Sequence, residues 1–255
     1  MTFFSRVNVI LHIIQLMFPI CKKELRQFFS SLTGYIAIIV FLLLNGLFLF
    51  VFPASSLFDY GYATLDKFFE LAPWILLLLI PAITMRSFAD EFKGGTYEIL
   101  QTRPVTSWQI IWGKYLASLI IMVIAILPTL IYVFTISRLS TGGIDTGGIA
   151  GSYIGLFFLA AVFTAIGICC SSFTSNAVVS FLLSAFACFV IYSAFSALST
   201  IPVFESGAGY FIEMLGIDTH YHSISRGVID SRDIVYFASV VILFLFLTAR
   251  NLVKR

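Results

Sequence analysis

Residues that could perform chemistry are few in this chain, and one group of them lies late in the sequence. His220 and His222 follow Glu213 by a few positions. Imidazoles and carboxylates are zinc ligands, but a His-x-His pair without a firm third ligand is a weak zinc pattern. The chain also has no H-E-x-x-H sequence and no nucleophile spaced to pair with a base. We therefore expect no metal site, and an enzyme is the least favoured class of function.

Nucleotide binding and redox chemistry find no support in the motifs either. A phosphate-binding G-x-x-x-x-G-K-[ST] loop is absent from the sequence. The four cysteines show no C-x-x-C spacing, and three of them lie inside apolar runs, so we interpret them as reduced packing residues. The net charge of +2 is too weak to favour nucleic acid as a partner.

The other polar stretch, residues 86–114 (RSFADEFKGGTYEILQTRPVTSWQIIWGK), has a dense pattern of helix signals. Arg86 and Asp90 are spaced to pair across one helical turn, and Gly94 and Gly95 should end that helix. Thr96 is a candidate N-cap for a second helix.

That second helix should occupy residues 97–102, with Glu98 in its first turn and Pro104 beyond its end. Thr106 and Gln109 then form a predicted capping box for a third helix, which carries Trp108 at the depth where Trp is enriched at membrane interfaces. The pattern predicts a short helix fixed at both ends, which could pass a force into the membrane. A well-capped interfacial loop without that role is equally compatible with it.

Composition places these segments in a membrane. Of 255 residues, 60% are hydrophobic and only 11% are charged, whereas soluble domains carry about 25% charged residues. The apolar residues form runs close to the ~20 residues that cross a bilayer as a helix. We predict an all-α, polytopic membrane protein whose six spans cover residues 34–52, 71–85, 116–136, 152–173, 177–198 and 234–249.

The charges between the spans predict orientation. With the N-terminus in the cytoplasm and alternating loops, only Lys67, Arg138, Arg226 and Arg232 of the 15 Lys and Arg residues lie outside, leaving 11 inside. Cytoplasmic loops carry the excess of basic residues, so both termini should be cytoplasmic. The 86–114 loop is then cytoplasmic, and residues 200–233 form an external loop.

The segment before the first span should lie on the cytoplasmic surface. Residues 22–31 have the pattern of an amphipathic interfacial helix, with cations for lipid headgroups and aromatic rings for the acyl boundary. We interpret residues 1–21 as an N-terminal extension, or as the result of a translation start site assigned too far upstream. Residues 22–255 are predicted to form one membrane domain. The interfacial residues are Lys22, Lys23, Arg26, Phe28 and Phe29.

Together the spans and the loop resemble the permease subunits of type 2 ABC exporters. The family's cytoplasmic loop pattern stands here as Arg86, Glu91, Gly95, Thr96, Glu98, Ile99, Leu100 and Pro104. The stretches FFSSLTGYIAIIVFLLLNGLFLFVF, LAPWILLLLIPAITMRSFADEFKGGTYEIL and HSISRGVIDSRDIVYF further resemble the gliding-motility-associated GldF permeases of Bacteroidota. The resemblance covers residue 22 to the C-terminus.

This resemblance implies a membrane pore in the bacterial inner membrane, made of two copies of the chain or of the chain and a homologue. It implies a separate GldA-like ATPase that binds ATP and Mg²⁺, and a GldG-like companion. It also implies that the surface helix is the family's interfacial elbow and that the helix near residues 96–102 is the coupling helix that docks on the ATPase.

Two other functions remain open at this point. A membrane scaffold or assembly factor of a surface machine would share the topology without transporting a substrate. A secondary transporter is disfavoured because no charged residue lies near the middle of any predicted span.

Overall fold

The structure of the chain is a computed structural model that describes residues 3–52, 64–102, 105–140, 143–200, 208–228 and 230–254. Within the described ranges the chain is helical, with no strand. The all-α fold is therefore confirmed. For residues 3–16, and for positions 101, 208, 210 and 212, the backbone alone is described.

Six helices are long and apolar enough to cross a membrane, which confirms the predicted number. Five of them extend beyond the predicted spans, because helix formation continues into amphipathic flanks that an apolar window leaves out, whereas the first is shifted by two residues toward the N-terminus. The six are α2 (Leu32–Phe50), α3 with its continuation to Lys93 (Asp66–Lys93), α6 to α7 (Ser107–Leu139), α8 (Thr146–Phe173), α9 to α10 (Ala177–Ser199) and α13 (Ser231–Val253).

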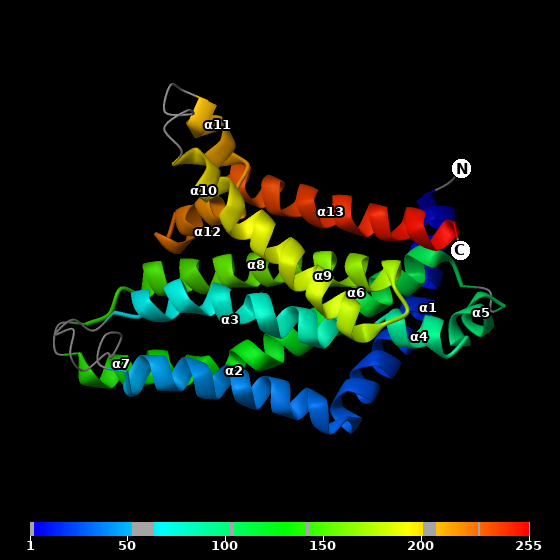
Figure 1. Cartoon of the computed structure of the whole chain (residues 1–255), viewed down its shortest axis with the longest axis horizontal. Coiled ribbons are helices and arrows are strands. Elements are labelled where there is room, and N and C mark those ends of the chain that lie inside the picture. Colours follow the sequence, from blue (N-terminus) through cyan, green and yellow to red (C-terminus); the bar gives the residue numbers. More distant parts are fainter. Residues whose placement is uncertain are drawn as a thin grey trace.

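The long helices run roughly side by side, and the shorter elements gather at the two ends of the bundle (Figure 1). At one end lie α4 (Ala89–Lys93) and α5 (Thr96–Gln101), together with the beginning of α1 (Phe3–Ser30) and the end of α13. At the other end lie α11 (Ala208–Met214) and α12 (Ile217–Ser225). The first and last described residues are thus on the same side as α4 and α5.

Two of the long spans contain irregular turns. The 3₁₀ turn η1 (Leu127–Thr129) contains Pro128 and divides the third span into α6 (Ser107–Ile126) and α7 (Leu130–Leu139). Proline removes a backbone donor and commonly kinks a helix, so the irregularity has a local cause. In the fifth span the π-helix η2 (Val190–Ala194) lies between α9 (Ala177–Phe189) and α10 (Phe195–Ser199).

Helix α8 is the centre of the bundle. Of its apolar window 83% is buried, against 22% for the peripheral helices α2 and α9, and it packs against α13, α3, α12, α9 and α6. Small residues allow this close approach. A Cβ built on Gly167 would lie 2.1 Å from Oγ1 of Thr84 on α3, so only glycine fits at this contact.

Gly167→Ala should therefore destabilise the bundle by about 1–3 kcal/mol, the usual cost of overpacking a close-packed core. Gly46→Ala is the matched control, since its Cβ would meet only the Tyr132 hydroxyl at an ordinary 3.7 Å. Both substitutions gain the same intrinsic helix propensity of about 1 kcal/mol. Thermal unfolding in detergent should show a lowered Tm for Gly167→Ala alone, and equal Tm values would contradict the close contact.

Candidate functional site

The polar stretch at the α4–α5 end is folded against the bundle through one serine of α8. The α3 helix ends at Thr84, and residues 85–88 form turns before α4 begins. Ser171 Oγ accepts hydrogen bonds from the backbone N–H groups of Phe88 at 2.9 Å and Ala89 at 3.2 Å, and it donates to the Met85 carbonyl at 3.1 Å. These backbone groups lie where the helix is interrupted, and the serine provides them with hydrogen-bond partners. The same bonds fix the start of α4 to the central helix α8.

The step from α4 to α5 depends on two glycines. Gly94 is the C-cap of α4, and Gly95 has a φ of +65°, which a residue with a Cβ rarely adopts. Gly95 occupies the N-cap position of α5, so Thr96 is the first helical residue and not the predicted N-cap. The Thr96 hydroxyl instead donates to the Glu91 carbonyl at 3.4 Å.

The short helix α5 is anchored on one face and exposed on the other. Tyr97 is buried, and its ring lies 5.1 Å from that of Phe92. Ile99 is 63% exposed. Beyond α5, the predicted capping box of the next helix is confirmed: Gln109 N–H donates to Thr106 Oγ1 at 3.4 Å, and Thr106 N–H donates to Gln109 Oε1 at 2.8 Å.

Four charged residues from three helices form an ion cluster beneath α4, and it consists of Lys23, Glu24, Glu91 and Lys114. Lys114 Nζ lies 2.8 Å from Glu24 Oε1 and 3.0 Å from Glu91 Oε1. Lys23 Nζ lies 2.8 Å from the same Glu91 oxygen. The cluster thus joins α1, α4 and α6, which are far apart in the sequence.

Lys114 is the most deeply buried member, with 1% of its side chain exposed. Its ammonium also donates to the Ser87 carbonyl and lies 4.9 Å from the centroid of the Phe88 ring. All three ammonium donors therefore have acceptors, as a buried charge requires. The two cations balance the two carboxylates, so the cluster carries no net charge into the apolar surroundings.

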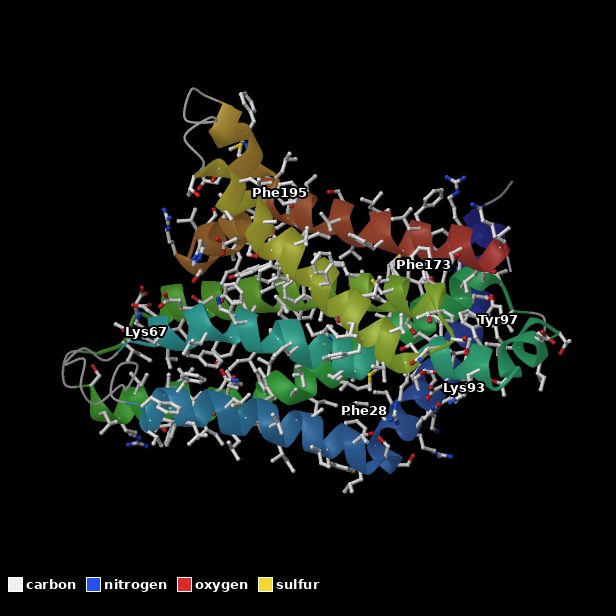
Figure 2. All side chains as sticks on the ribbon, in the orientation of Figure 1. Phe28, Lys67, Lys93, Tyr97, Phe173 and Phe195 are labelled. Atoms are coloured by element: carbon white, nitrogen blue, oxygen red, sulfur yellow. The ribbon has the colours of Figure 1, made fainter. Side chains whose placement is uncertain are left out.

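The elbow prediction is only partly matched by α1. The helix runs from Phe3 to Ser30 as one element that includes Pro19, so residues 22–30 are the end of a longer helix and Ser31 is the N-cap of α2. Lys22 and Arg26 are exposed, as the interfacial reading expects. Phe28 and Phe29 are partly buried and pack against the core of the bundle (Figure 2 labels Phe28).

The other predicted loop residues are scattered. The sequence predicts that Arg86 and Asp90 pair, but neither side chain forms an ion pair with another described residue. Both line the same cavity. Glu98 is exposed on α5. Pro104 lies outside the described residues. Of the predicted set, Glu91 and Lys23 alone enter the ion cluster.

Sequence reasoning missed Glu24, Lys114 and Ser171. Lys114 was counted only as a topology marker. One signal was present: Lys114 is the eighth residue of a well-capped helix, and its neighbours one turn away are Ile110, Ile111, Ala117 and the small Ser118, none of them charged. A charge on such an apolar face needs a buried partner. Nothing in the sequence says that Glu24 and Glu91 provide it.

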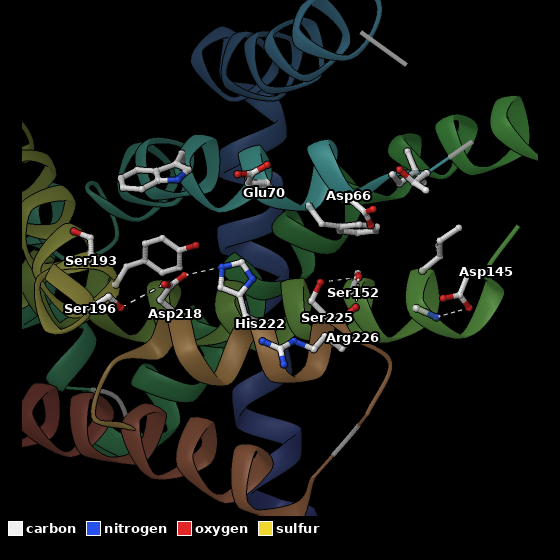
Figure 3. A pocket seen from close by; sticks show the side chains of 17 residues that line it. Asp66, Glu70, Asp145, Ser152, Ser193, Ser196, Asp218, His222, Ser225 and Arg226 are labelled. Carbon is white, nitrogen blue, oxygen red and sulfur yellow. Dashed lines mark hydrogen bonds and ion pairs between the residues drawn. The ribbon is translucent and has the colours of Figure 1, made fainter. Parts of the chain in front are cut away.

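The opposite end of the bundle contains a polar cavity of about 710 Å³ (Figure 3). Its lining comes from the N-terminal parts of α3 and α8, from η2 and α10 in the fifth span, and from α12. Helix α12 places Tyr221 in the core, where its hydroxyl donates to the Phe69 carbonyl at 2.7 Å. Asp218 and His222 face the cavity from the other side of α12, and Ser196 donates to Asp218 at 3.3 Å.

The histidines of α12 have separate partners. His222 Nε2 lies 3.3 Å from Asp218 Oδ1, whereas His220 Nδ1 lies 2.6 Å from Asp233 Oδ1 and its Nε2 lies 3.0 Å from the Met214 carbonyl. Both ring nitrogens of His220 are therefore occupied. No group of three or more His, Cys, Asp or Glu side chains in the described part of the chain could hold a metal ion.

Replacing Lys114 with methionine should strongly destabilise the protein. Glu24 would lose its closest cation, and Glu91 would keep only the more exposed Lys23. Breaking one partner out of a buried ion pair costs about 3–5 kcal/mol. Lys93→Met, on α4 but outside the ion cluster, is the control for loss of a lysine. Thermal unfolding in detergent distinguishes the two, and similar Tm values would show that the ion cluster does not stabilise the fold.

The His222–Asp218 pair should make α12 sensitive to pH. Hydrogen bonding to Asp218 raises the pKa of His222 above its ordinary 6.5, with burial and Arg226 opposing this and Glu70 of α3 supporting it. Burial by itself would raise the pKa of Asp218, but hydrogen bonding from His222 keeps it below its ordinary value. The contribution of this pair to the stability of the folded protein is complete when the pH is below the ordinary histidine pKa. It is lost as the pH rises through the raised pKa of His222.

Hydrogen exchange should therefore give higher protection factors for α12 near pH 6 than near pH 8.5, after correction for intrinsic exchange. His222→Gln keeps a polar side chain but cannot titrate, so it should reduce the pH dependence. The prediction fails if the substituted protein shows the same dependence as the parent.

The sequence was also compared with known families. A family model described as ABC-2 family transporter protein matches residues 18–250. The match includes the whole ion cluster, both α4 and α5, and nearly all of the six membrane-length helices. No curated protein matches the sequence. Because the matched region covers most of the chain, the chain belongs to the ABC-2 family of transporter proteins.

Proposed function

We propose that this membrane permease subunit exports its substrate across the bacterial inner membrane, driven by ATP hydrolysis in a separate cytoplasmic subunit. Membership of the ABC-2 family supports the permease role, because the membrane subunit of such a transporter is not itself the ATPase. The sequence agrees, since it contains no phosphate-binding loop. ATP and Mg²⁺ are therefore bound by the partner.

The coupling element of the proposal is α5 together with α4. The ion cluster is the observation that supports it best, because Glu91 on α4 is held by Lys23 of α1 and Lys114 of α6. A displacement of α4 by a bound ATPase would reach the surface helix and the third span directly. A groove of about 310 Å³ between α1 and α5, which includes Ile99 in its lining, offers an apolar surface for docking.

Orientation follows from the charges. The α4–α5 end contains the first and last described residues and most of the Lys and Arg residues, so we place it and both termini in the cytoplasm. The α12 end is then external. This orientation puts α5 where a cytoplasmic ATPase can reach it.

The partners that we propose are a GldA-like ATPase, a GldG-like companion, membrane lipid around the elbow, and a second permease, either identical or homologous. The sequence resemblance to the GldF permeases of Bacteroidota supports this set and a role in gliding motility or cell-surface assembly. The coupling residues are Arg86, Glu91, Gly94, Gly95, Thr96, Glu98 and Pro104.

Ile99→Glu should reduce the recovery of an ABC-type ATPase with the tagged, detergent-solubilised full-length chain by at least about tenfold, because a charge would be desolvated in an apolar contact. Val228→Glu, an exposed apolar position near α12, is the matched control. Mass spectrometry of the captured proteins is the measurement. Replacing residues 96–102 by a Gly/Ser linker should abolish recovery altogether.

Unchanged recovery in both α5 variants would refute α5 as the docking element. If no ATPase is recovered even with the parent chain under mild conditions, the transport role fails. A membrane scaffold of a surface machine would then explain the topology better.

A further inference from the structure

A second cavity lies inside the corner between α1 and α2. It has a volume of about 340 Å³ and is bounded by the end of α1, the beginning of α2, the end of α3 with the following turns, and α6. Hydrogen bonds hold the corner: Ser31 caps α2 by accepting from the Gly34 N–H at 3.3 Å, and it donates to the Phe28 carbonyl at 2.9 Å. We call this space the elbow cavity.

The lining of the elbow cavity changes character along its length. Ala37, Ile83 and Ile121 come from membrane-length helices and form an apolar part. Gln27, Arg86 and Asp90 form a polar part where α1 and α4 lie. Such a gradient, at the depth where the spans end, matches a molecule with an apolar tail and a polar head.

The polar part of the cavity contains charges of both signs that no other described residue neutralises. Arg86 and Asp90 have no ion-pair partner in the described part of the chain, although both line the cavity. Glu24 also lines it, but its carboxylate is bound to Lys114 at 2.8 Å. Among the residues that the structure describes, the cavity therefore offers one free cation and one free anion to an occupant.

From these features we propose that the elbow cavity binds a phospholipid with a zwitterionic ethanolamine headgroup. Arg86 pairs with the phosphate, since guanidinium groups match phosphate geometry, and Asp90 accepts hydrogen bonds from the primary ammonium. A headgroup that is only anionic would satisfy Arg86 but would face two carboxylates. A choline headgroup has no N–H to donate to Asp90.

The apolar part of the cavity accommodates the start of the acyl chains. The neighbouring face of α2 exposes Ile36, Ile39 and Val40, so the chains continue along a surface that the membrane already covers. The lipid would then contact α1 and α4 at once. This assignment does not depend on the transport proposal, because it concerns only the chain and its bilayer.

Native mass spectrometry of the delipidated full-length chain tests the proposal, with phosphatidylethanolamine, phosphatidylglycerol and phosphatidylcholine of identical acyl chains added in equal amounts. The ethanolamine lipid should be preferred by about tenfold over each of the others, the factor expected for one charge-assisted hydrogen bond. Soluble glycerophosphoethanolamine at the same concentration should not displace it, because it lacks the apolar part.

Two substitutions separate the roles of the charges. Arg86→Gln should weaken binding of the ethanolamine and glycerol lipids alike, and Arg86→Lys should retain the preference if Arg86→Gln proves unstable. Asp90→Asn should remove the preference for ethanolamine over glycerol. Lys93→Gln and Lys254→Gln, which remove exposed charges at this end of the bundle but do not line the cavity, are the controls and should behave as the parent.

Equal occupancy by the three lipids in the parent chain would overturn the assignment. So would an ethanolamine preference that survives Asp90→Asn, or lipid binding that Arg86→Gln leaves as strong as in the parent. Displacement by glycerophosphoethanolamine would show a site for the headgroup alone and would also refute a lipid occupant.

Discussion

A lysine ammonium in an apolar interior must be matched by acceptors on every side, and Lys114 imposes this constraint on the α4–α5 end of the bundle. Its acceptors come from the surface helix α1, from α4 and from the turn before α4. Since none of these segments could move away without leaving a buried charge unpaired, their relative positions are coupled. The elements predicted to receive a force and the helix that enters the membrane are thus held by one electrostatic contact.

The central helix α8 provides the other fixed reference. Gly167 lets α3 approach closely, and four residues later Ser171 bonds the backbone where α3 breaks into turns. The small residue and the hydrogen-bonding serine on one face of α8 therefore help to determine where α3 ends and how α4 continues from it. Hydrogen bonds of this kind matter more in a membrane, where water is not available to satisfy a broken helix.

The two ends of the bundle differ in how their polar groups are used. At the α4–α5 end the charges of the ion cluster are paired, while Arg86 and Asp90 line a cavity and have no ion-pair partner among the described residues. At the other end α12 lies across the ends of the spans, with Tyr221 in the core and His222 toward the polar cavity. Because the chain belongs to the ABC-2 family, both ends are parts of a membrane subunit that acts with a separate ATPase.

The sequence by itself determined the properties that depend on local pattern. Long apolar runs specified six helices, Gly94 and Gly95 specified the end of α4, and Thr106 with Gln109 specified the start of α6. Helix formation and capping involve neighbours within about four residues, so the sequence reveals them. Thr96 was assigned wrongly as a cap because Gly95, at positive φ, already ends the turn.

Only the tertiary structure decided which charges meet. Lys114 and Glu24 are 90 residues apart, and their contact depends on how α1 crosses α6. The expected pair of Arg86 with Asp90 did not form, because turns replace the helix that would have placed them on one face. Long-range pairing of polar groups is set by packing of whole helices, for which an apolar sequence with many equivalent faces gives little guidance.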